Sequence, residues 1–266
     1  NIVNAENWHS GLGYSSYLME YDSEYFDCFQ WVHENEEEKV IFLIKQIINY
    51  VQKIHIGVNS LKKENEYLLK NYHYQKVIKN IEFAQKSASN LINLDRFSLN
   101  GINYSISDLD FLSDYQNFSN IISFREQQEV HGDLTLDNIL VKNENDFKLI
   151  DPNPHKGFSN ELIDWAKLMQ SIHSGYEFIY TPNFLSIESS NILCIAPTSN
   201  TYKIIHKTFE SYLLEKYGMQ GLKQVYLHEI VHFLRLLPYK FASNSNMGLY
   251  FLAHTCKLTR EFQEKN

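Results

Sequence analysis

The sequence predicts an α+β fold that is mostly helical and contains one short β-hairpin. Apolar side chains in residues 38–55 recur at steps of three and four, which is the period of an amphipathic helix. Two apolar runs, residues 138–141 (NILV) and 147–150 (FKLI), flank a polar stretch, which is the pattern of two strands joined by a turn. With 266 residues, of which 44% are hydrophobic, the chain can bury a sizeable core.

The remaining elements are predicted from weaker patterns. Residues 15–21 (SSYLMEY) read as a strand after a glycine turn. Residues 61–94 are polar with a thin apolar stripe, which predicts one or two surface helices rather than core. Residues 95–120 are rich in Ser, Asn and Asp, so we expect a loop with a short helix. Four helices are predicted near the carboxyl end, with Pro238 ending the third, at residues 160–174, 201–217, 221–237 and 246–262.

Composition and charge argue against several classes of partner. A net charge of -8 leaves no basic field of the kind that attracts nucleic acid or anionic membranes. We see no apolar run of the length needed to span a bilayer. Cys28, Cys194 and Cys256 are an odd number at wide spacing, which favours neither a disulfide framework nor a thiolate zinc site. We therefore expect a cytoplasmic protein without nucleic-acid partners.

Polar residues suited to phosphoryl transfer flank the predicted hairpin. The segment HGDLTLDN precedes the first strand, and the second strand ends in Asp151. This chemistry needs a carboxylate beside an acceptor hydroxyl and oxygen ligands for the magnesium ion on the nucleotide. The spacing predicts Asp133 as the base and Asn138 and Asp151 as magnesium ligands. The competing interpretation is that these are ordinary turn and cap residues. Each residue taken alone favours that interpretation, but the combination at this spacing favours the catalytic one.

Two neighbours of Asp133 are expected to shape this loop. Gly132 allows the backbone to turn sharply, and His131 can brace the loop through hydrogen bonds.

HGDLTLDNIL and KLIDPNP resemble the aminoglycoside phosphotransferase and choline kinase group, the small-molecule branch of the protein-kinase-like fold. The resemblance implies that Asp133 is the catalytic base, that Asn138 and Asp151 bind Mg2+, that ATP is the phosphate donor and that a small-molecule hydroxyl is the acceptor. Residues 160–178 resemble a helix of kinases from bacterial surface-polysaccharide gene sets, which points to a sugar or polysaccharide precursor. Asp164 would brace the catalytic loop by accepting backbone N–H bonds, with an ordinary N-terminal helix carboxylate as the alternative.

Residues 17–21 (YLMEY) resemble the strand and hinge between the two lobes of this family. The resemblance implies that the backbone of Met19, Glu20 and Tyr21 hydrogen-bonds the adenine of ATP. A plain strand is the alternative interpretation.

With this hinge, residues 1–22 are a remnant of the small lobe and residues 23–266 form the helical catalytic lobe. The phosphate-covering loop and the strand lysine of the small lobe would then lie upstream of Asn1. Lys39 and Lys45 follow the hinge on a predicted helix, so neither can take that role. We expect either a fragment of a longer protein or a degenerate kinase.

Two other functions stay open. A kinase-fold module that binds without catalysis is favoured by the missing small lobe. His228-Glu229-Ile230-Val231-His232 matches HExxH, in which two histidines on one helix face bind zinc and the glutamate acts as base. Arg235 and Pro238 occupy the Gly and His positions of the longer zinc motif, so a third ligand is not identified.

Overall fold

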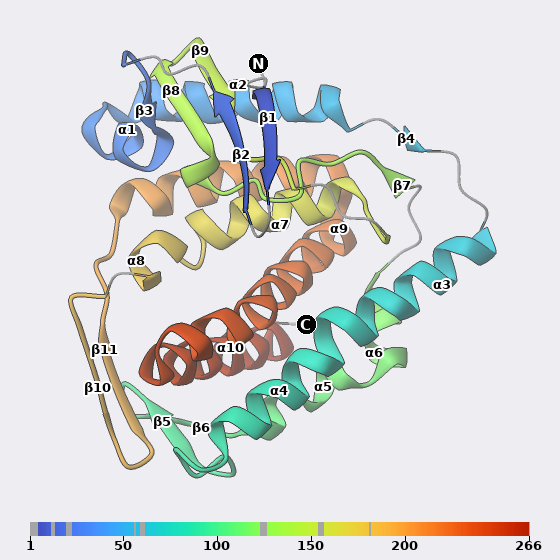
Figure 1. Cartoon of the computed structure of the whole chain (residues 1–266), viewed down its shortest axis with the longest axis vertical. Coiled ribbons are helices and arrows are strands. Elements are labelled where there is room, and N and C mark those ends of the chain that lie inside the picture. Colours follow the sequence, from blue (N-terminus) through green and yellow to red (C-terminus); the bar gives the residue numbers. More distant parts are fainter. Residues whose placement is uncertain are drawn as a thin grey trace.

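The computed structural model describes residues 5–11, 14–19, 23–55, 57–58, 62–122, 127–153, 157–180 and 182–265. Within these ranges the fold is α+β, with long helices and small sheets, as the sequence predicts. The β8–β9 hairpin and helix α2 lie at one end of the molecule, and helices α3 and α4 lie along the opposite side (Figure 1).

The predicted hairpin is present as β8 (Ile139–Asn143) and β9 (Asp146–Leu149), which pair antiparallel. A short strand, β3 (Phe26–Asp27), pairs with the outer side of β8 and completes a three-stranded sheet. Ile139, Val141, Phe147 and Leu149 alternate along the two strands and are buried. This alternation fixes the register of the hairpin, and with it the position of the residues at its open end.

One hydrophobic core lies around this hairpin. It combines β8 and β9 with α1 (Cys28–Glu34), α2 (Glu37–Ile54), α7 (Glu161–Ile172) and the first part of α9 (Asn200–Ser243). Helix α2 confirms the periodicity of residues 38–55, because its apolar stripe is buried against the core. Every residue of α7 is buried, so this helix passes through the centre of the protein.

Helix α9 consists of two helices joined at Gly218, whose φ of 65° and ψ of -176° are not helical. This agrees with two predicted helices, but Pro238 does not end the second one, which continues to Ser243. Proline removes one backbone hydrogen bond. Buried Leu237 and Lys240 on either side hold the adjoining turns against the core, so packing outweighs that loss.

The helices predicted at residues 61–94 are present, but the expectation that they contribute no core was wrong, because their apolar side chains help to form a second core. This segment forms α3 (Lys62–His73), a π-helical turn η1 (Tyr74–Ile78) and α4 (Lys79–Ala88), which pack on the second part of α9 and on α10 (Ser245–Glu264). The π turn inserts an extra residue into the helical period. The apolar residues therefore do not follow one uninterrupted stripe in the sequence. The buried ones include Leu69, Tyr72, Val77, Ile81 and Ala84.

Residues 95–120 are also more regular than the predicted loop. β5 (Phe97–Leu99) and β6 (Ile102–Tyr104) join β10 (Phe184–Glu188) and β11 (Asn191–Ile195) in a sheet of order β10-β11-β5-β6. Strands of three residues are too short for an alternating pattern to be detected. The chain continues through η2 (Ile106–Leu109), α5 (Asp110–Ser113) and α6 (Tyr115–Ile121), and α8 (Tyr176–Tyr180) follows α7.

Near the amino end, β1 (Ala5–Gly11) pairs antiparallel with β2 (Tyr14–Met19), so the strand expected at residues 15–21 is present in part. Glu20 and Tyr21 of the predicted hinge lie outside the described residues. A further small pair joins β4 (Gly57–Val58) to β7 (Gln127–Gln128). Among the helices of the described ranges, we find none with the length and apolar character needed to cross a membrane.

Candidate active site

The loop before β8 carries Asp133 and is folded back on itself by local hydrogen bonds. The backbone carbonyl of Asp133 accepts from the N–H of Thr135 at 2.9 Å and from Nδ2 of Asn138 at 2.7 Å. A short 3-10 turn, η3 (Leu136–Asn138), leads directly into the strand. Because its amide nitrogen is used on the loop, Asn138 keeps its side-chain oxygen as an acceptor.

Asp151 lies at the same end of the hairpin as Asn138. The N–H of Ile150 donates to the backbone carbonyl of Asn138 at 3.0 Å, and Asp151 is the next residue. Asp151 is exposed and has a φ of 51°, in the left-handed region that few residues other than glycine adopt. Strain of this kind concentrates at functional sites. Two residues further on, the N–H of Asn153 bonds the carbonyl of His131 at 2.6 Å and ties the segment to the Asp133 loop.

Asp164 makes the backbone hydrogen bonds expected of it. Its two carboxylate oxygens accept from the N–H groups of His131 and Gly132, each at 2.7 Å. It also lies in the first turn of α7, so the favourable helix-dipole interaction applies as well. His55, just after α2, contacts the same carboxylate at 3.0 Å through Nε2. No sequence motif surrounds His55, so this contact could not be predicted from the sequence.

His131 and Gly132 have the structural character that the sequence predicts. The His131 side chain is buried, and its Nδ1 lies 3.4 Å from the N–H of Asp133. Burial lowers the pKa of His131, which favours a neutral ring. Gly132 has a φ of 82°, a conformation that a Cβ atom would strain.

Lys167 is a site residue that sequence reasoning missed. Its Nζ lies 2.9 Å from Oδ1 of Asp133 and 3.1 Å from Oε1 of Gln170. Burial lowers the pKa of Lys167, and the charge of Asp133 opposes that effect. Two signals could have identified it. Lys167 follows Asp164 by one helical turn, and its immediate neighbours in the sequence, residues 165–166 and 168–169, are all apolar.

Asp133 opens into a cleft of about 380 Å³, which we call the Asp133 cleft. Its lining comes from the second part of α9 and from α7 and the π turn η1, each of which packs on α9. Its polar lining includes Asp133, Asn153, Lys167, Lys76, His232 and Arg235. Clefts of this size suit small molecules.

The histidines of the HExxH motif point to different partners. Nδ1 of His228 lies 3.2 Å from the hydroxyl of Tyr72, and Nε2 of His232 lies 3.1 Å from the carbonyl of Ile163. No group of three or more His, Cys, Asp or Glu side chains within the described ranges is arranged to hold a metal ion. The side-chain directions give the zinc interpretation no support.

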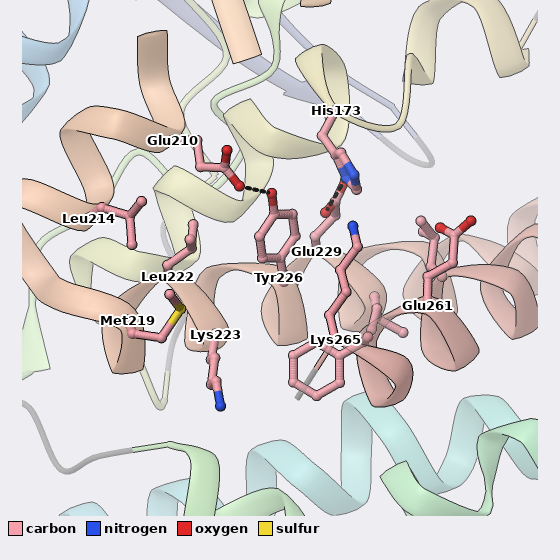
Figure 2. A pocket seen from close by; sticks show the side chains of 13 residues that line it. His173, Glu210, Leu214, Met219, Leu222, Lys223, Tyr226, Glu229, Glu261 and Lys265 are labelled. Carbon is pink, nitrogen blue, oxygen red and sulfur yellow. Dashed lines mark hydrogen bonds and ion pairs between the residues drawn. The ribbon is translucent and has the colours of Figure 1, made fainter. Parts of the chain in front are cut away.

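Glu229, the third member of that motif, faces a separate pocket of about 280 Å³ between α9 and α10 (Figure 2). Its carboxylate contacts Nδ1 of His173 at 3.0 Å and accepts from the hydroxyl of Ser174 at 2.6 Å. Burial is the largest single influence and lowers the pKa of His173, but the charge and the hydrogen bond of Glu229 act together in the other direction, and the net shift is upward. No residue of the Asp133 loop lines this pocket.

No protein-family model, curated protein or solved structure was found to match the chain. One hairpin end combines a carboxylate in a braced loop, an amide oxygen and a second, exposed carboxylate.

Proposed function

We propose that this protein is a small-molecule kinase of the protein-kinase-like fold, which moves the terminal phosphate of ATP to a hydroxyl. The observation that carries the proposal is the convergence of Asp133, Asn138 and Asp151 at one end of the β8–β9 hairpin. The bond from Asn138 to the Asp133 carbonyl supports it further, because this bond orients the amide oxygen away from the loop.

The donor set fits magnesium. Mg2+ prefers oxygen ligands and keeps several of its waters, so one amide oxygen and one carboxylate from the protein are sufficient. Asn138 and Asp151 would hold the ion. When bound, Mg2+ would neutralise charge on the nucleotide phosphates.

The other residues of the site would act by positioning. Asp133 orients the acceptor hydroxyl and accepts its proton. Lys167 fixes the Asp133 carboxylate through their ion pair, and Asp164 fixes the backbone of the loop. This division of labour suits a reaction in which orientation and charge neutralisation supply most of the rate.

The nucleotide base would lie against the backbone near Met19, the last residue of β2, and against Glu20 and Tyr21. In this proposal residues 1–22 are the remnant of the small lobe and residues 23–266 the catalytic lobe. A cytoplasmic location would suit an ATP-dependent enzyme, and the three cysteines are unpaired and buried.

The test is ADP release in the presence of Mg-ATP and a panel of hydroxyl compounds, compared between the wild type and Asp133→Asn. We expect turnover to fall by at least about a thousandfold, since base and orientation are both lost. Nucleotide binding and the melting temperature should change little. Glu144→Gln, in the turn at the opposite end of the same hairpin, is the matched control and should keep full turnover.

Each outcome decides between functions. Turnover retained in Asp133→Asn contradicts the role of Asp133 as base. Asp151→Asn should weaken Mg2+-dependent nucleotide binding, and an unchanged magnesium dependence contradicts the metal assignment. A wild type that binds ATP but turns over with no compound of the panel would select the non-catalytic binding module.

A further inference from the structure

Three cationic side chains from three different elements line the Asp133 cleft. Lys76 comes from the π turn η1, Lys167 from α7 and Arg235 from α9. Among the described residues that line the cleft, Asp133 is the one carboxylate. The whole chain carries a net charge of -8, so this excess of positive charge is a local feature.

The charge of Arg235 acts on both lysines. Burial lowers the pKa of Lys76, and the charge of Arg235 lowers it further. For Lys167 burial is again the largest cause, and Arg235 again adds to the lowering. Gathering like charges in a partly buried space raises the free energy of the protein unless an anion compensates them. Asp133 forms an ion pair with Lys167.

Arg235 is oriented by His232. Nη1 of Arg235 lies 3.3 Å from Nδ1 of His232, while Nε2 of that ring lies 3.1 Å from the carbonyl of Ile163. Arginine can only donate, so Nδ1 accepts, and Nε2 carries the proton that is donated to the carbonyl. His232 is therefore a neutral ring that holds a guanidinium at the cleft and adds no charge.

Neutral amides complete the lining. Gln75, Asn80 and Asn153 belong to the cleft. A guanidinium, two ammonium groups and side-chain amides are the donors that recognise phosphate and carboxylate groups, with arginine supplying two-point contacts.

The cleft lies beside Asp133 and apart from the two proposed metal ligands. Asp133 lines it, but Asn138 and Asp151 do not. The nucleotide phosphates belong with the metal ligands, so the cations of the cleft are placed for a group on the other reactant.

We infer that the acceptor is an anionic small molecule, whose phosphate or carboxylate group is bound by Lys76 and Arg235 while its hydroxyl lies beside Asp133. The inference rests on the proposed function and names its substrate class. The Asp133 carboxylate takes the hydroxyl proton, and the hydroxyl oxygen forms a bond to the terminal phosphorus of ATP. The bond between that phosphorus and the bridging oxygen of ADP breaks. The products are ADP, a phosphorylated anion and a protonated Asp133.

The test is calorimetric titration of the protein with anionic hydroxy compounds and their neutral parents. The probes are glycerol 3-phosphate, glucose 6-phosphate, glucose 1-phosphate, glucuronate and glycerate, with glycerol and glucose as parents and inorganic phosphate as the smallest anion. A non-hydrolysable Mg-ATP analogue fills the nucleotide site in a parallel series. At least one anion should bind tenfold or more tightly than its parent, with and without the analogue.

Variants locate the binding. Lys76→Gln and Arg235→Gln should each weaken anion binding by about tenfold, the loss of one charge-assisted contact. Lys79→Gln is the matched control, because Lys79 is an exposed lysine one turn further along the same helical segment. It should leave binding unchanged. Phosphate esters and carboxylates in the panel distinguish the two kinds of anion.

The inference is overturned if no anion binds more tightly than its parent, or if both cleft variants bind like the wild type. It is also overturned if the Mg-ATP analogue displaces every anion, because binding would then belong to the nucleotide site. Asp151→Asn separates the two proposals. For Asp151→Asn we expect nucleotide binding to be lost and anion binding to be retained. If the wild type binds anions but no nucleotide, the proposed kinase function is contradicted and the anion site is not.

Discussion

The ammonium of Lys167 lies 2.9 Å from the carboxylate of Asp133, although the two residues belong to different elements. Lys167→Met should keep the volume of the side chain and remove this contact, so the Asp133 carboxylate would lose its fixed orientation. We expect turnover to fall by at least about tenfold while nucleotide affinity stays within about twofold. Steady-state kinetics and nucleotide titration measure both quantities.

The control for that variant is Lys203→Met, which removes an exposed lysine of α9. The same loss of turnover in both variants would point to a general effect of charge. Full turnover in Lys167→Met would show that Asp133 needs no partner.

Asp164→Ala should destabilise the protein strongly. The substitution leaves the buried N–H groups of His131 and Gly132 without their acceptor and removes the partner of His55. Breaking a buried charged network costs about 3–5 kcal/mol of unfolding free energy. Asp164→Asn keeps one acceptor oxygen and should lose less. Urea denaturation gives both values.

The reference for this comparison is Glu215→Ala, at an exposed carboxylate of α9, which should change the unfolding free energy by less than about 0.5 kcal/mol. An Asp164→Ala protein as stable as the wild type would refute the bracing role.

The His173–Glu229 pair predicts a pH-dependent stability. The pKa of His173 is raised above its ordinary value of 6.5 in the folded protein. A raised histidine pKa contributes stability that is present below the unfolded pKa and is lost as pH rises through the folded pKa. The wild type should therefore exceed His173→Gln in unfolding free energy by more at about pH 5.5 than at about pH 8.5.

Denaturation at both pH values measures this difference, with Glu229→Gln as the second arm, because it removes the charge that raises the pKa. The ring of His206 contacts that of His173 with centroids 4.8 Å apart, and burial followed by the His173 charge lowers the pKa of His206. A difference that grows with pH would have the wrong sign for this mechanism.

Gly248→Ala should loosen the packing of α10 on α9. A methyl group at this position would overlap the ring of Phe241. Overpacking of this kind costs about 1–3 kcal/mol. Combining the substitution with Phe241→Leu should cost less than the sum of the two single changes, because the smaller side chain leaves room for the methyl group. Strictly additive losses in urea denaturation would contradict the contact.

The hairpin and α2 could be predicted because their signals are local. A four-residue apolar run on each side of a polar turn, or one unbroken helical stripe, is contained in a short stretch of sequence. The hydrogen bonds from the loop to Asp164 could be anticipated because the HGD motif predicts a sharply turned loop, whose backbone N–H groups need an acceptor. The interrupted helical period at the π turn η1 and the three-residue strand β5 left no comparable pattern.

The cationic lining of the Asp133 cleft could not be predicted from the sequence. Lys76, Lys167 and Arg235 lie far apart along the chain, and each has an ordinary sequence context. They share a space only because α7 and η1 both pack on α9. Such contacts depend on tertiary packing, which no local pattern encodes.

The non-helical joint at Gly218 divides α9 into two parts that pack in different hydrophobic cores. Tyr202, Ile205 and Phe209, before it, pack in the core around the hairpin, whereas Phe233 and Leu237, well beyond it, pack in the core with α3 and α10. Arg235 therefore belongs to the part of the protein built on one core, and Asp133 to the part built on the other. A shift of one core relative to the other would change the distance between Arg235 and Asp133, which an acceptor has to span. Substitutions distant from the cleft would therefore change which acceptors it binds, although no residue that contacts the acceptor is altered.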